Sequence, residues 1–464
     1  MKKVLKSFIL ILLCVCTCLT FTGCGKTKWS ETTVNTQGVL SNGGIVLTST
    51  QDGWLYFVNG TKKNTTANVE KSNVQSAIYR VKTDDKGNIL YKEPTTKASG
   101  DKKEVKEFQQ IERVVDNVVG YKDGSIYAFG DYIYYATPSK SVNDDGEMLN
   151  NKTEFRRYDL KNQRSHAIYT NASSSDTLTY GYYVQNNSLF LLVFEKNKET
   201  LTSLQIGDEI KTVFVKNDVK SVLLSEAVNG DDFAEKYVYY TLSYEPNAVV
   251  QRGVRVFRVL PNGTDEAKIS QDKDIALLSV RGTSIIYSYN KYVYHRVLDA
   301  TVTSLPTEEL NVVCHEEYEN IVFEETSAGH NATGILFYDN TSIRYMKWDN
   351  GVCTVNEIIH GFGPSQKVTF IGVDGDFVIY EHKDVICKSQ FKNITDPDLK
   401  KPIELSKTNI DEAKDLMAPE IMNGYLYGFY TDSKSEITYL YRISLEAPEV
   451  EGELENAEFI GVKE

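Results

Sequence analysis

The chain has 464 residues, of which 41% are hydrophobic and 25% are charged, and its formal net charge is -13. This composition is that of a folded globular protein, so it excludes wholesale disorder and a multi-pass membrane protein. Tyrosine is unusually abundant, with 30 residues against 19 Phe and 3 Trp. Because tyrosine suits pleated surfaces that are half exposed to water, the composition favours an all-β fold.

The N-terminal segment predicts export from the cell. Three lysines precede an apolar run from Phe8 to Phe21, which is shorter than the ~20 residues of a transmembrane helix but suits a signal peptide. The run continues into Phe-Thr-Gly-Cys ending at Cys24, which resembles the lipobox of bacterial lipoproteins, with Phe where Leu is usual. The resemblance implies that residues 1–23 are a signal peptide and that Cys24 is acylated. Ordinary signal cleavage that leaves a free thiol is the alternative.

Lipidation would place the protein on the extracytoplasmic face of the cell membrane. Each buried CH₂ contributes about 0.8 kcal/mol, so the two or three acyl chains that the resemblance implies would anchor the chain without a transmembrane helix. Residues 24–42 are polar and are predicted to form a flexible tether. Loss of residues 1–23 changes the charge to 48 minus 64, or -16, which argues against nucleic acid as a partner and against a broad membrane-binding face.

Three cysteines remain outside the signal peptide and its lipobox, namely Cys314, Cys353 and Cys387. Their number is odd and no CxxC or metal-type spacing is present, so a disulfide framework is not predicted. Each cysteine lies in an apolar, strand-like context, which indicates a buried and unreactive thiol. One bridge among the three is the open alternative.

Short apolar or aromatic runs recur along the rest of the chain, most of them after a turn signal such as Asp-Gly or Asn-Gly. Eight positions are taken as equivalent in these runs: Tyr56, Tyr134, Phe190, Tyr239, Ile286, Phe337, Ile379 and Tyr427. The steps between them are 78, 56, 49, 47, 51, 42 and 48 residues. The first step is long because it contains insertions rich in Lys, Thr and Asn at 60–75 and 95–106. The other steps are typical of propeller blades of ~40 to 50 residues.

Each run is predicted to be one strand of a small antiparallel sheet. A second strand with an arginine signature follows several runs, as in 77–81, 256–259, 294–297 and 440–443, with a looser copy at 155–158. Another apolar strand precedes several runs, as in 44–47, 221–224, 275–278 and 368–371. Three strands and a weaker fourth make a blade, and a radial stack of blades covers both apolar faces of each sheet.

The sequence therefore predicts an all-β protein with a single β-propeller over residues 43–464, built from four-stranded antiparallel blades. Eight blades is the predicted number and seven the fallback, because the unit around Phe190 is the weakest repeat. The segment 457–462 is expected to form the outer strand of the last blade, with 32–40 as the alternative. Helical signals are nearly absent, and only 411–416 favours a short turn of helix.

The paired strand signature resembles a family of bacterial propeller repeats of unknown function. These repeats are themselves similar to the β-propeller of low-density-lipoprotein-receptor-related proteins. The resemblance covers residues 43–445, but the Tyr-Trp-Thr-Asp core of the receptor family is not present. It therefore implies the fold and assigns no active residues.

Candidate chemistry is sparse, and no catalytic, cofactor-binding or metal-binding residue is assigned. The five histidines His295, His315, His330, His360 and His382 lack metal-type spacing and are predicted to be ordinary strand or loop residues. The acidic loop 143–147 has oxygen ligands but lacks the calcium-binding pattern of an EF-hand, so it is interpreted as a solvated turn.

Repeated arginines are the most regular polar feature of the chain. We expect them to stack on tyrosine and to need a carboxylate or a backbone partner, rather than to bind a ligand. They are Arg80, Arg258, Arg296 and Arg442.

Two classes of function remain open from the sequence. The leading hypothesis is a lipid-tethered binding or scaffold module whose partner is a protein or a cell-envelope polymer such as cell-wall polysaccharide. The alternative is an extracellular carbohydrate-active enzyme with its site in the central channel. A structural role in the envelope, or help in folding other exported proteins, is a weaker third hypothesis. Propellers host many functions, so the fold does not decide between these hypotheses.

Overall fold

The computed structural model of the protein describes residues between Gly44 and Val462, in separate segments. The described residues are 44–48, 53–60, 77–92, 108–115, 125–138, 152–171, 177–224, 237–244, 253–270, 275–281, 284–290, 292–297, 305, 312–314, 320–323, 334–339, 341–349, 352–361, 367–392, 402–407, 413–432, 438–446 and 457–462. Within these segments, no helix has the length and apolarity needed to cross a bilayer.

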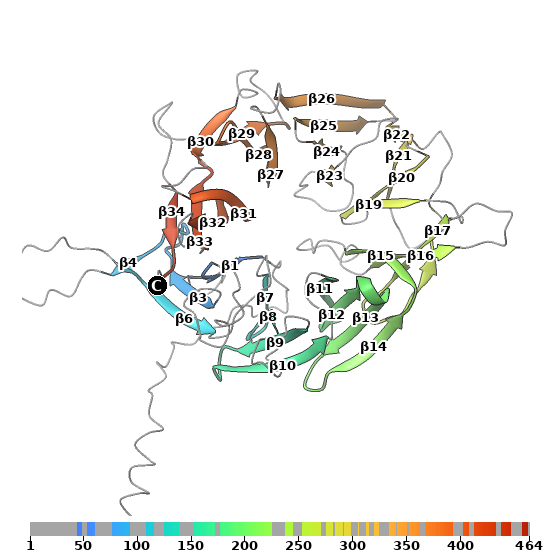
Figure 1. The fold of residues 1–464 in the computed structure, drawn as a ribbon, viewed down its shortest axis with the longest axis horizontal. Helices are drawn as coiled ribbons and strands as arrows, with labels where there is room; N and C mark the ends of the chain where they lie inside the picture. Colours follow the sequence, from blue (N-terminus) through green and yellow to red (C-terminus); the bar gives the residue numbers. More distant parts are fainter. Residues whose placement is uncertain are drawn as a thin grey trace, which may run out of the picture. The chain divides into compact units, whose positions relative to one another are not determined.

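Eight four-stranded antiparallel sheets follow one another along the chain, and each sheet is one blade of a β-propeller (Figure 1). We number the blades 1 to 8 in chain order. Blade 1 contains β1 (Val46–Thr48), β2 (Trp54–Val58), β3 (Ile78–Lys82) and β6 (Ile111–Val115). Blade 2 contains β7 (Ile126–Phe129), β8 (Tyr132–Pro138), β9 (Thr153–Asp159) and β10 (Arg164–Asn171). Blade 3 contains β11 (Leu178–Gln185), β12 (Ser188–Glu195), β13 (Thr200–Ile206) and β14 (Lys211–Lys216).

The remaining blades repeat the same plan. Blade 4 contains β15 (Val219–Leu224), β16 (Val238–Tyr244), β17 (Gly253–Val259) and β18 (Ala267–Lys268). Blade 5 contains β19 (Ala276–Arg281), β20 (Ser284–Tyr289), β21 (Tyr292–Val297) and β22 (Val312–Cys314). Blade 6 contains β23 (Asn320–Phe323), β24 (Gly334–Tyr338), β25 (Ser342–Asp349) and β26 (Val352–His360). Blade 7 contains β27 (Val368–Asp374), β28 (Phe377–His382), β29 (Val385–Gln390) and β30 (Ile403–Lys407). Blade 8 contains β31 (Ala413–Met422), β32 (Tyr425–Asp432), β33 (Thr438–Ser444) and β34 (Glu458–Ile460).

Two small elements lie outside this plan. The strands β4 (Tyr91–Lys92) and β5 (Phe108–Gln109) form a two-stranded ribbon, inserted between β3 and β6 of blade 1. The 3₁₀ turn η3 (Lys196–Lys198) is the one helical element in the described part of the chain. The prediction of an all-β propeller with eight four-stranded blades is therefore confirmed, and the fallback of seven is not needed.

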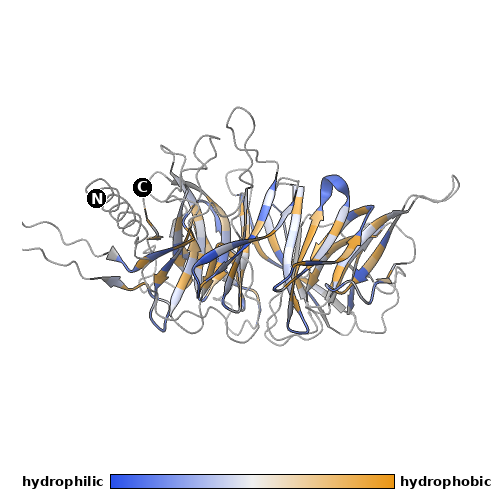
Figure 2. Cartoon of the chain, turned by 90° about the horizontal axis from the view of Figure 1, so that it is seen from below, coloured by the Kyte–Doolittle hydropathy of each residue, from blue (hydrophilic) through white to orange (hydrophobic). Residues whose placement is uncertain are grey.

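Apolar side chains between the blades hold the ring together. The first strands of neighbouring blades touch, as β11 touches β15 and β15 touches β19. Buried clusters join blades 2 and 3, 3 and 4, 4 and 5, 6 and 7, and 7 and 8. Figure 2 shows the apolar residues concentrated in the strands and hydrophilic residues at many of the turns. Both faces of a blade are covered, which is why β2 is buried at all five positions.

The eight aromatic or apolar runs all form the second strand of a blade, so the predicted equivalence is confirmed. The unit around Phe190 has the weakest sequence signal, yet blade 3 is a regular sheet in which β12 is buried at seven of its eight positions. Its run of Leu, Val and Phe lacks tyrosine but packs in the same way. Burial of apolar side chains therefore determines this strand, and tyrosine is not required.

Six of the fourth strands carry a β-bulge, which explains their weak signal in the sequence. On each third strand, one residue pairs with the equivalent position of the second strand. Five bulges lie at the same place, opposite the two third-strand residues that precede this partner. The extra residue is always aliphatic: Val114, Ile168, Val213, Val313, Ile358 and Leu405. A bulge shifts the alternation of side chains by one residue, so a period-two pattern does not continue through these strands.

Blade 8 corrects one prediction and confirms another. Within the predicted helical turn at 411–416, the described residues 413–416 are not helical, because β31 begins at Ala413 and continues to Met422. Pairing with β32 overrides the weak local preference for a helical turn. The predicted outer strand of the last blade is confirmed as β34. The alternative at 32–40, the insertion at 95–106 and all but Gly60 of the insertion at 60–75 lie outside the described residues.

Leu191 tests how far the blades depend on apolar packing. It is fully buried in the cluster between blades 2 and 3. We expect Leu191→Ala to lower the free energy of unfolding by about 2–5 kcal/mol, because the cavity is closed in by both blades. The matched control is Val215→Ala on the edge strand β14, where the side chain is 52% exposed and the expected loss is below ~0.5 kcal/mol. Urea denaturation followed by circular dichroism measures both, and equal losses would contradict this view of the core.

Candidate functional site at the junction of the last and first blades

The repeated arginines belong to a belt of polar residues on the third strands. Each equivalent position of the second strand pairs with one long polar residue, and we call these eight residues the belt. They are Arg80, Arg157, Gln205, Arg258, His295, Arg344, Lys388 and Arg442. The sequence analysis found three of them, and the others become visible only when the strand register aligns the blades.

Belt cations stack on an aromatic ring of their own blade. In five blades the ring lies two residues before the equivalent position, so the contact runs diagonally across the strand pair. Arg344 instead lies 6.0 Å from the centroid of Phe337, the residue directly opposite. Arg80 lies 4.1 Å from the centroid of Trp54, and Arg442 lies 4.1 Å from that of Tyr425. Arg157, Arg258 and Lys388 contact Tyr132, Tyr237 and Phe377 in the same manner. The expected stacking on tyrosine is therefore confirmed for Arg258 and Arg442, whereas Arg80 stacks on a tryptophan ring instead.

Arg296 does not belong to this set, so the prediction for it is wrong. It pairs with Ile285, one position away from the belt, and its side chain is exposed. His295 occupies the belt position of blade 5 instead. Successive side chains of a strand point to opposite faces of the sheet, so Arg296 and the belt residue His295 lie on different faces.

Three belt cations also reach the next blade. Arg157 Nη1 donates to the carbonyl oxygen of Gly207 at 3.0 Å, and Lys388 Nζ donates to the carbonyl oxygen of Leu445. Arg442 Nη1 donates to the carbonyl oxygen of Gly87 at 2.7 Å. Each acceptor lies just beyond the third strand of the following blade. These three members of the belt therefore connect neighbouring blades.

The contacts between blades 8 and 1, which we call the closing junction, stand out from the other junctions. Blade 1 is built only from N-terminal strands and blade 8 only from C-terminal strands, so the two share no strand. Peptide chain connects the blades at the other seven junctions. Here the ring is held by side-chain contacts between residues more than 300 positions apart in the sequence.

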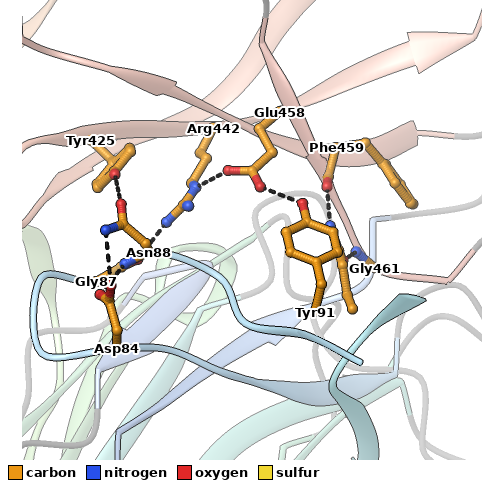
Figure 3. A network of polar contacts seen from close by, with 10 residues as sticks. Asp84, Gly87, Asn88, Tyr91, Tyr425, Arg442, Glu458, Phe459 and Gly461 are labelled. Atoms are coloured by element: carbon orange, nitrogen blue, oxygen red, sulfur yellow. Dashed lines mark hydrogen bonds and ion pairs between the residues drawn. The ribbon is translucent and has the colours of Figure 1, made fainter. Parts of the chain in front are cut away.

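Arg442 is the centre of the outer part of the closing junction (Figure 3). Its Nε donates to Glu458 at 2.6 Å, while its Nη1 reaches Gly87 in the hairpin after β3. The ring under the guanidinium, Tyr425, donates its hydroxyl to Asn88 Oδ1 at 3.1 Å. Asp84 orders this hairpin by accepting from the backbone and side chain of Asn88, and these bonds lower the pKa of the Asp84 carboxyl.

The ribbon of β4 and β5 covers the edge of β34. Tyr91 donates its hydroxyl to Glu458 at 2.7 Å. Gln109 Nε2 donates to the carbonyl oxygen of Phe459 at 2.7 Å, and Gln109 Oε1 accepts from the backbone N–H of Gly461 at 3.3 Å. The amide of Gln109 therefore takes the place of a strand residue and satisfies an edge that would otherwise be open.

Asn59 repeats this arrangement deeper in the closing junction. Its Nδ2 donates to the carbonyl oxygen of Val462 at 2.9 Å, and its Oδ1 accepts from the Val462 N–H at 3.0 Å. Only 1% of Asn59 is exposed. Gly461 has a φ of +129°, and a Cβ there would lie 2.0 Å from Asn59 Oδ1. The close approach of Asn59 therefore requires glycine at this position.

Glu420 occupies the inner part of the closing junction. It lies on β31, and its Oε2 accepts from the backbone N–H of Val46 on β1 at 3.1 Å. A Cβ on Gly44 would lie 2.1 Å from Glu420 Oε1, so the carboxyl fills the space that Gly44 leaves. Burial raises the pKa of Glu420 to about 7, while the N–H groups of Val46 and Ile45 act in the opposite direction.

The backbone around Glu420 is irregular. The pairing of β31 with β32 shifts between Met417 and Glu420, and Ala418 in between has a φ of +48°. A non-glycine residue in the left-handed region is strained and persists only where its surroundings impose it. The bulge places Glu420 opposite Tyr427, whose pKa is raised to about 12 by burial. The sequence offered no signal for Glu420, because neither its spacing nor its neighbours form a motif.

The described histidines do not converge. His295 is partly buried, and this burial lowers its pKa to about 4. His360 ends β26 and lies 3.4 Å from Glu357, and His382 ends β28. His315 and His330 lie outside the described residues. Within the described part of the chain, no three His, Cys, Asp or Glu side chains come together as metal ligands.

Cys387 is a free, buried thiol, and burial raises its pKa to about 12. The predicted unreactive character is therefore confirmed for this cysteine. Cys314 lies on β22 and Cys353 on β26, and their side chains are outside the described set. The expected lipidation site, Cys24, and the acidic loop 143–147 are also outside the described residues, so both remain predictions.

Comparison with known proteins assigns the chain to no family. No family model matches the chain, and no curated protein matches it. A eukaryotic initiation factor is similar at 9% identity and a TM-score of 0.44, over 92% of this chain and 89% of that one. A protein from Lactobacillus plantarum has 10% identity and a TM-score of 0.34, over 88% and 99% of the two chains. An oligogalacturonate lyase in complex with manganese has 9% identity and a TM-score of 0.33, over 89% and 99%. Identities and scores of this order carry no argument about function.

Asn59 tests the closing junction directly. We expect Asn59→Leu to lower the free energy of unfolding by roughly 1–3 kcal/mol, because the Val462 N–H and carbonyl oxygen lose their partner in a buried site. Urea denaturation provides the measurement. Asn356→Leu on the exposed face of β26 is the matched control and should change the midpoint little. A loss at Asn59 no larger than at Asn356 would show that the side-chain amide does not hold the junction.

Proposed function

We propose that the protein is a lipid-tethered extracytoplasmic propeller that acts as a binding or scaffold module for a protein or a cell-envelope polymer. The observation that carries this proposal is the belt. The repeated cations, which a catalytic or anion-binding ring would direct at a ligand, instead stack on aromatic rings and bond to neighbouring blades. In this proposal the belt stabilises the ring as a frame, and the exposed surface of the propeller binds the partner.

The proposed tether is supported by the N-terminal sequence. The signal peptide over residues 1–23, the lipobox-like end at Cys24 and the polar segment 24–42 together suit an acylated anchor on the extracytoplasmic face of the cell membrane. The formal charge of -16 after removal of the signal favours a neutral or basic partner over nucleic acid.

The alternative, a carbohydrate-active enzyme, would draw on Glu420 alone. Glycoside hydrolysis commonly needs two carboxyl groups on either side of the scissile bond. Glu420 has the raised pKa of a general acid, but it accepts from the Val46 N–H and its described surroundings contribute no second carboxyl. A binding module is therefore the function that the described geometry supports best.

Acylation of Cys24 is tested by metabolic labelling of a bacterial expression host with an alkyne analogue of palmitate. We expect the wild-type protein to carry the label and to sediment with membranes. Cys24→Ser should lose the label and retain residues 1–23, because processing depends on the same cysteine. Cys16→Ser is the matched control, since Cys16 lies in the segment expected to be removed, and it should behave as wild type. Label on the Cys24→Ser protein, or none on the wild type, would contradict the tether.

The binding role is tested with the purified full-length protein in detergent. We expect it to be retained by isolated cell walls, or to form a specific crosslink to an envelope protein, without converting either. Arg296→Ala changes an exposed residue outside the belt and serves as a control for surface charge. Turnover of cell-wall glycan, or the absence of both retention and crosslinking, would contradict the proposed role.

A further inference from the structure

Glu420 is a partly buried ionisable group that the proposed function does not use. Its position is defined by the fold: β31 is the first strand of blade 8, β1 is the first strand of blade 1, and the carboxyl lies between them. β1 pairs with β2 on one side only, so the Val46 N–H that Glu420 accepts belongs to the free edge of β1. The side chain thus joins the two strands at the one junction that no peptide chain crosses.

The carboxyl has few charged neighbours to stabilise a negative charge. β1 supplies backbone N–H groups and no ionisable side chain. From β32, Tyr427 faces Glu420 and is neutral at physiological pH, because burial raises its pKa to about 12. From β33, Arg442 acts on Tyr427 but is ion-paired with Glu458 at 2.6 Å. The described surroundings therefore leave the cost of burying a charge largely uncompensated.

We propose that Glu420 is a proton-operated latch of the propeller, which holds blades 8 and 1 together as a neutral carboxyl and loosens the closing junction as a carboxylate. The neutral carboxyl keeps an oxygen that accepts from the Val46 N–H, so the bond between the blades survives protonation. The carboxylate gains more from hydration than the neutral acid does, and separation of β31 from β1 would expose it more fully to water.

The direction of the pH dependence follows from the two states. The pKa of Glu420 is about 7 in the closed ring, against an ordinary value of 4.5 that applies once the group is solvated. A raised pKa in the closed state means that its stabilising contribution is complete below about 4.5 and is lost as the pH rises through about 7. These two values make closure about tenfold less favourable at pH 8 than at pH 6.

Hydrogen exchange of the full-length protein, followed by mass spectrometry at pH 6 and pH 8, tests the latch. After correction for the intrinsic effect of pH, peptides that cover β1 and β31 should lose about tenfold in protection at pH 8. Peptides from β12 and β13 in blade 3 should keep theirs. Glu420→Gln cannot ionise and retains an acceptor oxygen, so its junction peptides should be equally protected at both pH values.

The matched control is Glu209→Gln, which removes a carboxylate whose side chain is 81% exposed in the turn before β14. This variant should lose protection at the closing junction between pH 6 and pH 8 as the wild type does. Equal protection at both pH values in the wild type would overturn the proposal. So would a loss that spreads evenly over all blades, or a loss that persists in Glu420→Gln. If Glu420→Gln does not fold, the wild-type comparison of β1 and β31 with β12 and β13 decides alone.

Discussion

A ring of sheets must close on itself, and the rest of this structure depends on how it does so. Each of the eight blades is built from consecutive strands, so the first and last blades share no strand. At the closing junction, side-chain amides instead form the hydrogen bonds that the backbone of a neighbouring strand would form. The amides of Asn59 and Gln109 each accept and donate as a strand residue would, at Val462 and at the edge of β34. A polar junction of this kind fixes direction and register, because each amide bonds to one donor and one acceptor only.

The cations of the belt are likewise paired with groups of the protein itself. Several of its cations are held by an aromatic ring on one side and by a carboxylate or a carbonyl oxygen on the other, as Arg80 is held by Trp54 and Glu112. This arrangement explains why tyrosine and arginine recur together in the repeat. A buried guanidinium needs every donor occupied, and a ring face beside it supplies attraction without a further charge. Residues that would suggest a binding site in isolation are therefore part of the frame.

Inner and outer contacts at the closing junction differ in charge. In the outer part, Arg442 and Glu458 form an ion pair, in which the opposite charges stabilise each other. Glu420 has no such partner among the described residues, and burial alone shifts it towards the neutral form. One junction thus combines a charged clamp with a group that titrates near neutrality. The strained Ala418 lies beside that group, at the place where β31 departs from regular pairing.

The sequence by itself determined the repeat, the eight second strands and the fold class, because apolar residues at regular spacing must be buried on both faces of small sheets. It also located Arg80, Arg258 and Arg442, since an arginine in the strand that follows the aromatic run recurs with the same period. Only the tertiary structure decided the fourth strands, the place of His295 rather than Arg296 in the belt, and the role of Glu420. Bulges change the alternation that sequence patterns rely on, and a contact between Glu420 and Val46, 374 residues apart, leaves no local trace in the sequence.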